Sequence, residues 1–321
     1  MSFRNILFPT DFTPHARSAL KYAAAFARAG HGRVILFNVQ PAHVPPNLMT
    51  LPERVLEDQE NSWLLELRKQ VHTLLSDPLF DGLEVEPVIV EGEPASEIAR
   101  AVRDYDVDLV TVVTRGRRVL ARALFGSTAE EIIATAPCPV LTIRPPQHGF
   151  VEHREGHSQI HLNRILLATN FRPSSFTAMQ KARELSETIG AELHAVYVIG
   201  DYFEQISLLF PDEGTAALSR MRNEVQDRME AFARERGANV KVHVAEGRPY
   251  MEIVRLAAEI DADLIVIGTS VHASLLGGAP VLGSEIERVL RNAPCPVLCV
   301  PSGRVVTPLP SFTHRQPVPQ T

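Results

Sequence analysis

The chain has 321 residues, of which 45% are hydrophobic and 22% charged, and its net charge at pH 7 is -6. This composition is typical of a globular protein long enough for two domains, and the negative charge argues against a general attraction to nucleic acid or to an anionic membrane surface. No apolar run is as long as a membrane span and the N-terminus has no signal-peptide pattern, so we expect a cytoplasmic protein.

The first half alternates short apolar strands with helices. Strands are expected at 6–9, 34–39, 83–90, 109–113 and 140–143. Helices are expected at 14–30, 53–75, 94–103 and from 126 onward. Thr13 is the expected N-cap of the first helix and Pro14 its first residue. The alternation predicts an α/β fold with a mostly parallel sheet covered by helices on both faces.

A basic loop joins the strand at 109–113 to the helix that opens at Gly126. The loop contains Arg115, Gly116, Arg117, Arg118 and Arg122. A helix N-terminus offers unpaired N–H groups and a partial positive charge, so it is a natural site for an anion. Gly126 would let a ligand approach the backbone closely, and Ser127 would add a hydroxyl group.

The second half repeats this order of strand, loop, helix and strand from Asp263 to Val300, so the chain is an internal duplication. Its strands are expected at 165–168, 192–198, 240–245, 264–268 and 297–300. Its helices are expected at 174–189, 214–236 and 250–259, and from 283 onward. We therefore predict two domains, at 1–145 and 163–301, with a linker at 146–162 and a disordered Pro-containing tail at 302–321.

The histidines and cysteines of the chain are the residue types that could bind a metal such as zinc. On a helix, His153, His157 and His161 of the linker would align, but a His-rich polar linker without a site is favoured because no cysteine lies near them. The three cysteines of the chain lie beside or within expected buried strands, so they are interpreted as reduced, packed thiols. They are Cys138, Cys295 and Cys299.

At the two loop-and-helix segments the chain resembles the universal stress protein family in its tandem two-domain form. The family motif is Gly-x-x-Gly, nine residues, then Gly-Ser or Gly-Thr. In the first half Gly116, nine residues and Gly126-Ser127 fit it, but Val113 replaces the leading glycine. In the second half Gly268 and Gly283-Ser284 fit, Val271 replaces the second glycine, and the spacer is two residues longer. The resemblance implies two five-stranded, doubly wound, Rossmann-like sheets in tandem.

The resemblance also implies an adenine-nucleotide site in the first half, binding ATP with Mg²⁺ or alone. Asp11 would contact the adenosine portion, and the backbone near Val39 would line the adenine pocket. The phosphates would lie against the segment after strand 109–113 and the following helix N-terminus. The residues implied there are Thr114, Arg115, Gly116, Arg117, Gly126, Ser127 and Thr128. The residues alone also allow a simpler interpretation, in which Asp11 and Ser127 only cap helices.

The second half lacks several of these features. Asn170 stands where the first half has Asp11, and the loop 269–282 has no Lys or Arg. We therefore expect the second half to bind nucleotide weakly or not at all and to pair with the first half as a built-in dimer. The resemblance implies that the final strands, 140–143 and 297–300, form that contact. A homodimer of whole chains and the identity of protein partners stay open.

No catalytic arrangement is evident in the sequence. It has no Gly-x-Ser-x-Gly elbow, no Gly-x-x-x-x-Gly-Lys-Ser/Thr loop and no clear base to orient water at a γ-phosphate, so any ATP hydrolysis is expected to be slow. The leading hypothesis is a stress-response protein that binds ATP and acts through conformation or partners. The alternative is an interaction scaffold whose nucleotide motifs have decayed, and a third hypothesis, an adenylating hydrolase, would need a catalytic motif.

Overall fold

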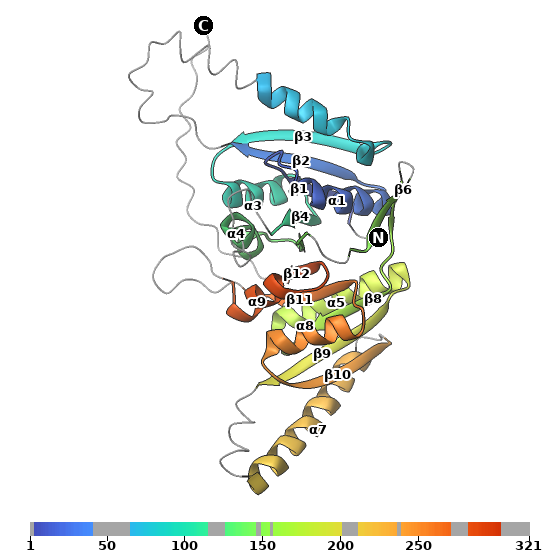
Figure 1. Cartoon of the computed structure of the whole chain (residues 1–321), viewed down its shortest axis with the longest axis vertical. Coiled ribbons are helices and arrows are strands. Elements are labelled where there is room, and N and C mark those ends of the chain that lie inside the picture. Colours follow the sequence, from blue (N-terminus) through green and yellow to red (C-terminus); the bar gives the residue numbers. More distant parts are fainter. Residues whose placement is uncertain are drawn as a thin grey trace, which may run out of the picture.

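The computed structural model describes residues 3–40, 65–114, 126–145, 149–154, 157–200, 211–235, 239–270 and 282–302. In this part of the chain, ten strands form one sheet in the order β10-β9-β8-β11-β12-β5-β4-β1-β2-β3. Figure 1 shows this sheet with helices along it. The expected loop at 41–52, Trp63 and the tail from 303 onward lie outside the described residues.

The first half contributes five parallel strands in the order β3-β2-β1-β4-β5. Its strands are β1 (Asn5–Pro9), β2 (Arg33–Gln40), β3 (Glu84–Glu91), β4 (Leu109–Val113) and β5 (Val140–Ile143). Its helices are α1 (Arg17–Gly30), the short η1 (Pro78–Phe80), α3 (Pro94–Asp104) and α4 (Ser127–Thr135), and residues 65–75 are also helical.

The second half repeats this order as β10-β9-β8-β11-β12. Its strands are β8 (Arg164–Ala168), β9 (Glu192–Gly200), β10 (Val240–Gly247), β11 (Leu264–Thr269) and β12 (Val297–Pro301). Its helices are α5 (Pro173–Ile189), α7 (Pro211–Glu235), α8 (Pro249–Glu259) and α9 (Ser284–Asn292). The predicted fold class, two tandem five-stranded parallel α/β units, is confirmed.

The two five-stranded units join edge to edge at a single seam. β12 pairs antiparallel with β5. The Thr142 hydroxyl donates a hydrogen bond to the carbonyl oxygen of Val297 (3.0 Å), and Arg144 donates one to the carbonyl oxygen of Ala293 (2.7 Å). The final strands that the resemblance implied would meet therefore do so, and they merge the two units into one ten-stranded sheet.

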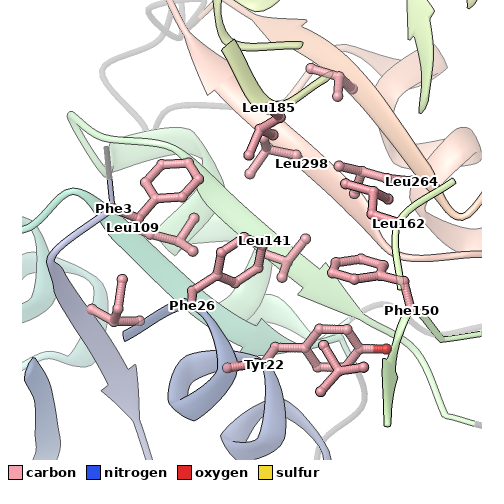
Figure 2. Packing of buried hydrophobic residues seen from close by; sticks show 14 of the residues in the cluster. Phe3, Tyr22, Phe26, Leu109, Leu141, Phe150, Leu162, Leu185, Leu264 and Leu298 are labelled. Carbon is pink, nitrogen blue, oxygen red and sulfur yellow. The ribbon is translucent and has the colours of Figure 1, made fainter. Parts of the chain in front are cut away.

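The hydrophobic core has one layer on each face of the sheet, and each layer contains residues from both halves. On one face α1 and α5 pack against the strands, and on the other α3, α4, α8 and α9 do so. Figure 2 shows the first layer, where the rings of Tyr22, Phe26 and Phe150 lie near Leu141 and Leu298. Because both layers cross the seam, the halves share their apolar burial.

The cysteines have the environment that the sequence predicted. All three are free thiols and buried. Burial raises the pKa of each thiol to about 12, so the neutral form is strongly favoured at neutral pH. They are packed side chains and not disulfides.

The segment expected to be an irregular linker contains regular structure. β6 (Val151–Arg154) and β7 (His157–Ile160) form an antiparallel hairpin that contacts α1. Phe150 is 1% exposed and its ring lies 5.0 Å from that of Tyr22, so the hairpin is fastened to the core. The histidines at 153 and 157 therefore lie on paired strands and not on one helix face. The proposed domain boundaries themselves stay a prediction.

The first helix begins later than the sequence predicted, and a residue on β4 explains why. α1 starts at Arg17, after a turn at 14–16, and not at Pro14. In the second half a Cβ on Gly268 would lie 2.4 Å from the backbone of Ser174, so α5 starts close against β11 only because position 268 is glycine. Val113 is the matching residue of the first half, and its side chain packs with Ala16 against the core. The helix start must make room for it.

Among the described helices, none is long and apolar enough to cross a membrane.

Candidate functional site

The candidate site lies at the carboxyl ends of the first-half strands, beginning with Asp11 after β1. Asp11 is exposed, and its Oδ1 accepts a hydrogen bond from the backbone N–H of Thr13 (2.9 Å). The Thr13 hydroxyl oxygen in turn accepts from the N–H of Ala16 (3.3 Å). Asp11 thus stabilises the turn before α1, as the simpler interpretation expected. Its carboxylate still has acceptor capacity for a ligand.

A buried polar network holds this turn, and the sequence analysis did not identify it. Thr10 accepts a bond from the Asn38 side chain at its carbonyl oxygen (2.7 Å) and from the N–H of Phe12 at its hydroxyl (3.0 Å). Phe12 has a φ of 58°, a left-handed conformation that costs energy for a bulky residue. Thr169 and Phe171, with a φ of 59°, repeat this arrangement, so the duplication was the available signal.

Thr114 and Gly126 tie the end of β4 to the start of α4. Thr114 is buried, and its N–H donates to the carbonyl oxygen of Ile143 (3.0 Å) at the end of β5. Its own carbonyl oxygen accepts from the N–H of Gly126 (3.0 Å), which is the N-cap of α4. The two contacts fix the N-terminus of α4 at the edge of the sheet.

The first turn of α4 is open to solvent. Ser127 and Thr128 are exposed, and no side chain caps the helix at Gly126. The first N–H groups of a helix have no partner within it, so this turn presents donors and a partial positive charge. Both hydroxyl groups add further donors.

Two hydrophobic residues border the site in different ways. Val39, at the end of β2, is half-buried and packs on the α3 and α4 face of the sheet. Val113 is also partly buried but packs on the opposite face, with α1. Its side chain therefore points away from α4, and the substitution of the leading motif glycine does not block the α4 N-terminus.

Six of the predicted site residues thus come together at one edge of the sheet. They are Asp11, Val39, Thr114, Gly126, Ser127 and Thr128. The other three, Arg115, Gly116 and Arg117, lie outside the described residues. This arrangement of polar groups suits a nucleotide. Asp11 can accept hydrogen bonds from hydroxyl groups on one side, and the N–H and hydroxyl groups at the start of α4 can donate to phosphate on the other. In the described ranges, no group of three or more acidic, His or Cys side chains could hold a metal ion.

The corresponding edge of the second half is arranged differently. Asn170 also accepts a bond from the backbone, at the N–H of Arg172 (3.1 Å), but its oxygen further accepts from the Ser175 hydroxyl (2.9 Å). Gly283 is the N-cap of α9, as Gly126 is of α4. Residues 271–281, in the loop between β11 and Gly283, lie outside the described residues. The amide of Asn170 is neutral and already engaged, so at the position of Asp11 the second half has no acidic acceptor.

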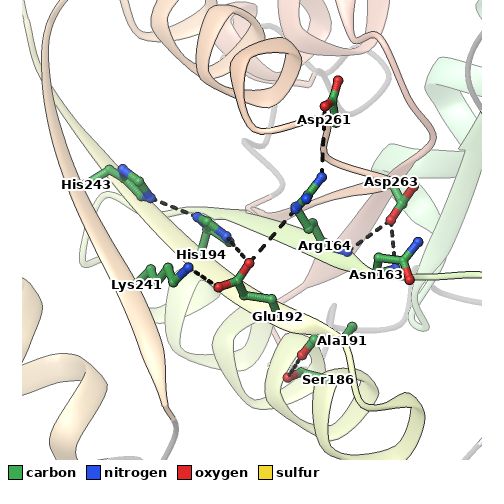
Figure 3. A network of polar contacts seen from close by, with 10 residues as sticks. All are labelled: Asn163, Arg164, Ser186, Ala191, Glu192, His194, Lys241, His243, Asp261 and Asp263. Atoms are coloured by element: carbon green, nitrogen blue, oxygen red, sulfur yellow. Dashed lines mark hydrogen bonds and ion pairs between the residues drawn. The ribbon is translucent and has the colours of Figure 1, made fainter.

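A second polar network lies at the opposite, amino ends of the second-half strands (Figure 3). The rings of His194 and His243 stack with centroids 5.2 Å apart, and a nitrogen of one lies 2.9 Å from a nitrogen of the other. Glu192 lies 3.3 Å from the other nitrogen of His194 and also pairs with Lys241. Burial and the neighbouring His194 lower the pKa of His243. β9 and β10, which carry the two histidines, are separated from β4 by four other strands of the sheet. The network is therefore not part of the candidate site at the start of α4.

Comparison with known proteins identifies the family. The family model described as "Universal stress protein family" matches residues 2–144 and 161–301. A universal stress protein of Methanocaldococcus jannaschii (MJ0531) is 33% identical over 43% of this chain and 81% of its own length. One from Mycolicibacterium smegmatis is 26% identical over 92% of this chain and 96% of its own length. The crystal structure of a universal stress protein from Archaeoglobus fulgidus has a TM-score of 0.60 at 22% identity, covering 94% of this chain and all of that chain, which supports the fold. The chain belongs to the universal stress protein family and carries two of its domains in tandem.

Proposed function

We propose that the chain binds ATP, or a related adenine nucleotide, with its N-terminal half, and acts in a stress response through its conformation or protein partners. The observation that carries the proposal is the hydrogen bond between Thr114 and Gly126, because it holds the exposed start of α4 at the edge where Asp11 lies. Membership of the family supports the choice of an adenine nucleotide.

Each part of the nucleotide has a matching part of the site. Asp11 accepts hydrogen bonds from the ribose hydroxyls, and the backbone near Val39 lines the adenine. The phosphates lie at the start of α4, where N–H groups, hydroxyls and the helix dipole favour negative charge. The residues assigned to the phosphates are Thr114, Arg115, Gly116, Arg117, Gly126, Ser127 and Thr128. The second half binds nucleotide weakly or not at all.

Paired glycine substitutions test the site and its asymmetry. Gly126→Val should abolish most ATP binding in a calorimetric titration, because a side chain would fill the space that a phosphate needs. Gly283→Val is the matched control, since Gly283 is also an N-cap and a Cβ there would touch, among the described residues, only Ile286 at an ordinary 3.9 Å. It should leave binding nearly unchanged, at one nucleotide per chain. Circular dichroism checks that both variants fold.

A second measurement separates phosphate recognition from adenosine recognition. Replacing Arg115, Arg117 and Arg118 together by Ala should weaken ATP binding more than adenosine binding, because charge assists only the phosphate contacts. An equal loss for both ligands would count against placing the phosphates here. If the wild-type chain binds no adenine nucleotide, or if only the Gly283 variant loses binding, the proposal is wrong, and the first of these results favours the interaction scaffold.

A further inference from the structure

A cavity of about 410 Å³ lies between the start of α1 and the end of β5. Pro14, Ile143 and Pro145 form apolar walls, and four polar side chains of α1 line the rest: Arg17, Ser18, Lys21 and Tyr22. These four residues fall on successive turns of one helix face. A few convergent polar groups among apolar walls, in a volume of this order, is the usual composition of a small-molecule site.

Lys21 brings a charge to this cavity that no acidic side chain of the described residues offsets. Its side chain is half-buried and its Nζ lies 5.2 Å from the centre of the Tyr22 ring. No carboxylate of the described residues forms an ion pair with it, whereas Arg17 pairs with the buried Asp77 at 2.5 Å. Burial lowers the pKa of Lys21, which means that its charge lacks solvation. A bound anion would restore what burial removes.

Neighbouring groups of α1 add hydrogen-bond donors that, like Lys21, favour an anion. The Ser18 hydroxyl and the remaining N–H groups of Arg17 can donate, and both residues lie in the first turn of α1, where the helix dipole favours negative charge. The Tyr22 hydroxyl lies beside Gly149, where a Cβ would be only 2.5 Å from it, so a glycine keeps that end of the ring unobstructed. Figure 2 shows the Tyr22 hydroxyl directed toward the chain at Phe150, the residue before β6.

We propose that this cavity binds a phosphate group, either free or on a small phosphorylated compound, with Lys21 as its principal cation. A tetrahedral, doubly charged oxyanion can use an ammonium group, a guanidinium group and a hydroxyl at once, whereas a carboxylate has only two oxygens. The cavity has room for more than the phosphate itself.

This site is separate from the proposed nucleotide site and does not depend on it. Tyr22 and Ile143, which line the cavity, belong to the core layer on the α1 face, whereas α4 packs on the opposite face of the sheet. Both sites lie at the carboxyl ends of first-half strands, since Ile143 accepts a bond from Thr114. The chain would then bind two phosphorylated ligands at the same edge of the sheet.

Calorimetric titration of the full chain with inorganic phosphate, at constant ionic strength, tests the proposal. The wild type should bind saturably. Lys21→Met keeps the aliphatic stem but should weaken binding about tenfold or more. Lys21→Arg should retain binding, and Lys69→Met, at an exposed lysine, should leave it unchanged. Thermal melting verifies that the variants fold.

Four outcomes would overturn the proposal. The first is no saturable binding of phosphate by the wild type, and the second is equal binding by the Lys21→Met and Lys69→Met variants. The third is that acetate competes as well as phosphate does. The fourth is that ATP displaces phosphate while Lys21→Met weakens the binding of ATP but not of adenosine. The last would make the cavity part of the nucleotide site. Phosphate binding by a chain that binds no ATP would instead refute only the nucleotide proposal.

Discussion

Val113 and Gly268 occupy matching positions at the ends of β4 and β11, yet the structure tolerates a side chain at only one of them. A Cβ on Gly268 would lie 2.4 Å from the carbonyl carbon and oxygen of Ser174, which are backbone atoms and cannot rotate away. Gly268→Ala should therefore destabilise the protein by about 1–3 kcal/mol, the usual cost of overpacking. Urea unfolding measures this loss.

Gly200 provides the control for that change. It lies at the end of β9, and none of the described residues comes within 4 Å of a Cβ built there. Gly200→Ala should leave the free energy of unfolding unchanged or raise it slightly, because alanine restricts the unfolded chain. If the two variants were equally stable, the close approach of α5 to β11 would not be what requires glycine at 268.

The stacked pair of His194 and His243 predicts a pH effect on stability. Only one of the two facing nitrogens can carry a proton while their contact lasts. Burial, followed by the proximity of the His194 ring, lowers the pKa of His243. The unfolded state then binds protons more readily than the folded state, with an ordinary His pKa of about 6.5. Stability should fall as the pH drops below about 6.5 and stop falling, for this group, below the pKa of the folded state.

Urea unfolding between pH 5 and pH 8 tests this effect by comparing variants. His243→Gln should flatten part of the pH dependence, whereas His72→Gln, at an exposed histidine outside the network, should not. Carboxylates that titrate in both proteins cancel in the difference. Parallel pH profiles for the wild type and His243→Gln would contradict the prediction.

At the scale of elements, the hairpin of β6 and β7 packs against α1 and stabilises its position. Phe150 anchors it, with its ring 5.0 Å from that of Tyr22 and 6.1 Å from that of Phe26. Phe150→Ala should cost about 3–5 kcal/mol of stability, because it leaves a cavity in a packed aromatic cluster. Gln159→Ala, on the exposed side of the same hairpin, should cost less than about 0.5 kcal/mol. Chemical unfolding distinguishes an anchored hairpin from one that only rests on the surface.

The elements also show where sequence patterns predict structure and where they do not. The buried strands and most helices were predicted within a few residues, because apolar runs and glycine or proline boundaries are local signals. The hairpin was missed because its strands are short and polar, and its burial depends on Phe150 meeting α1. The late start of α1 depends on Val113, distant in sequence. The Thr10 and Asn38 network was missed for the same reason, although the position of Asp11 beside it was predicted.

At the scale of the molecule, the seam of β5 and β12 predicts one cooperative unfolding transition. These strands lie in the middle of the ten-stranded sheet, and both core layers contain residues of both halves. Far-ultraviolet circular dichroism and tyrosine fluorescence should therefore give coincident urea transitions. Leu141→Ala and Leu298→Ala, on either side of the seam, should each shift the whole transition and not split it. Two resolved transitions would show that the halves unfold independently.

The antiparallel seam has a further consequence for how such a chain can evolve. Because β5 and β12 run in opposite directions, the carboxyl ends of the two sets of strands lie at opposite edges of the sheet. In a dimer of identical chains, every mutation would alter both edges at once. Here each edge is encoded separately, so one edge can carry Asn170 and Gly268 while the other carries Asp11 and Val113. Joining two copies in one chain thus lets a symmetrical scaffold acquire two independent ends.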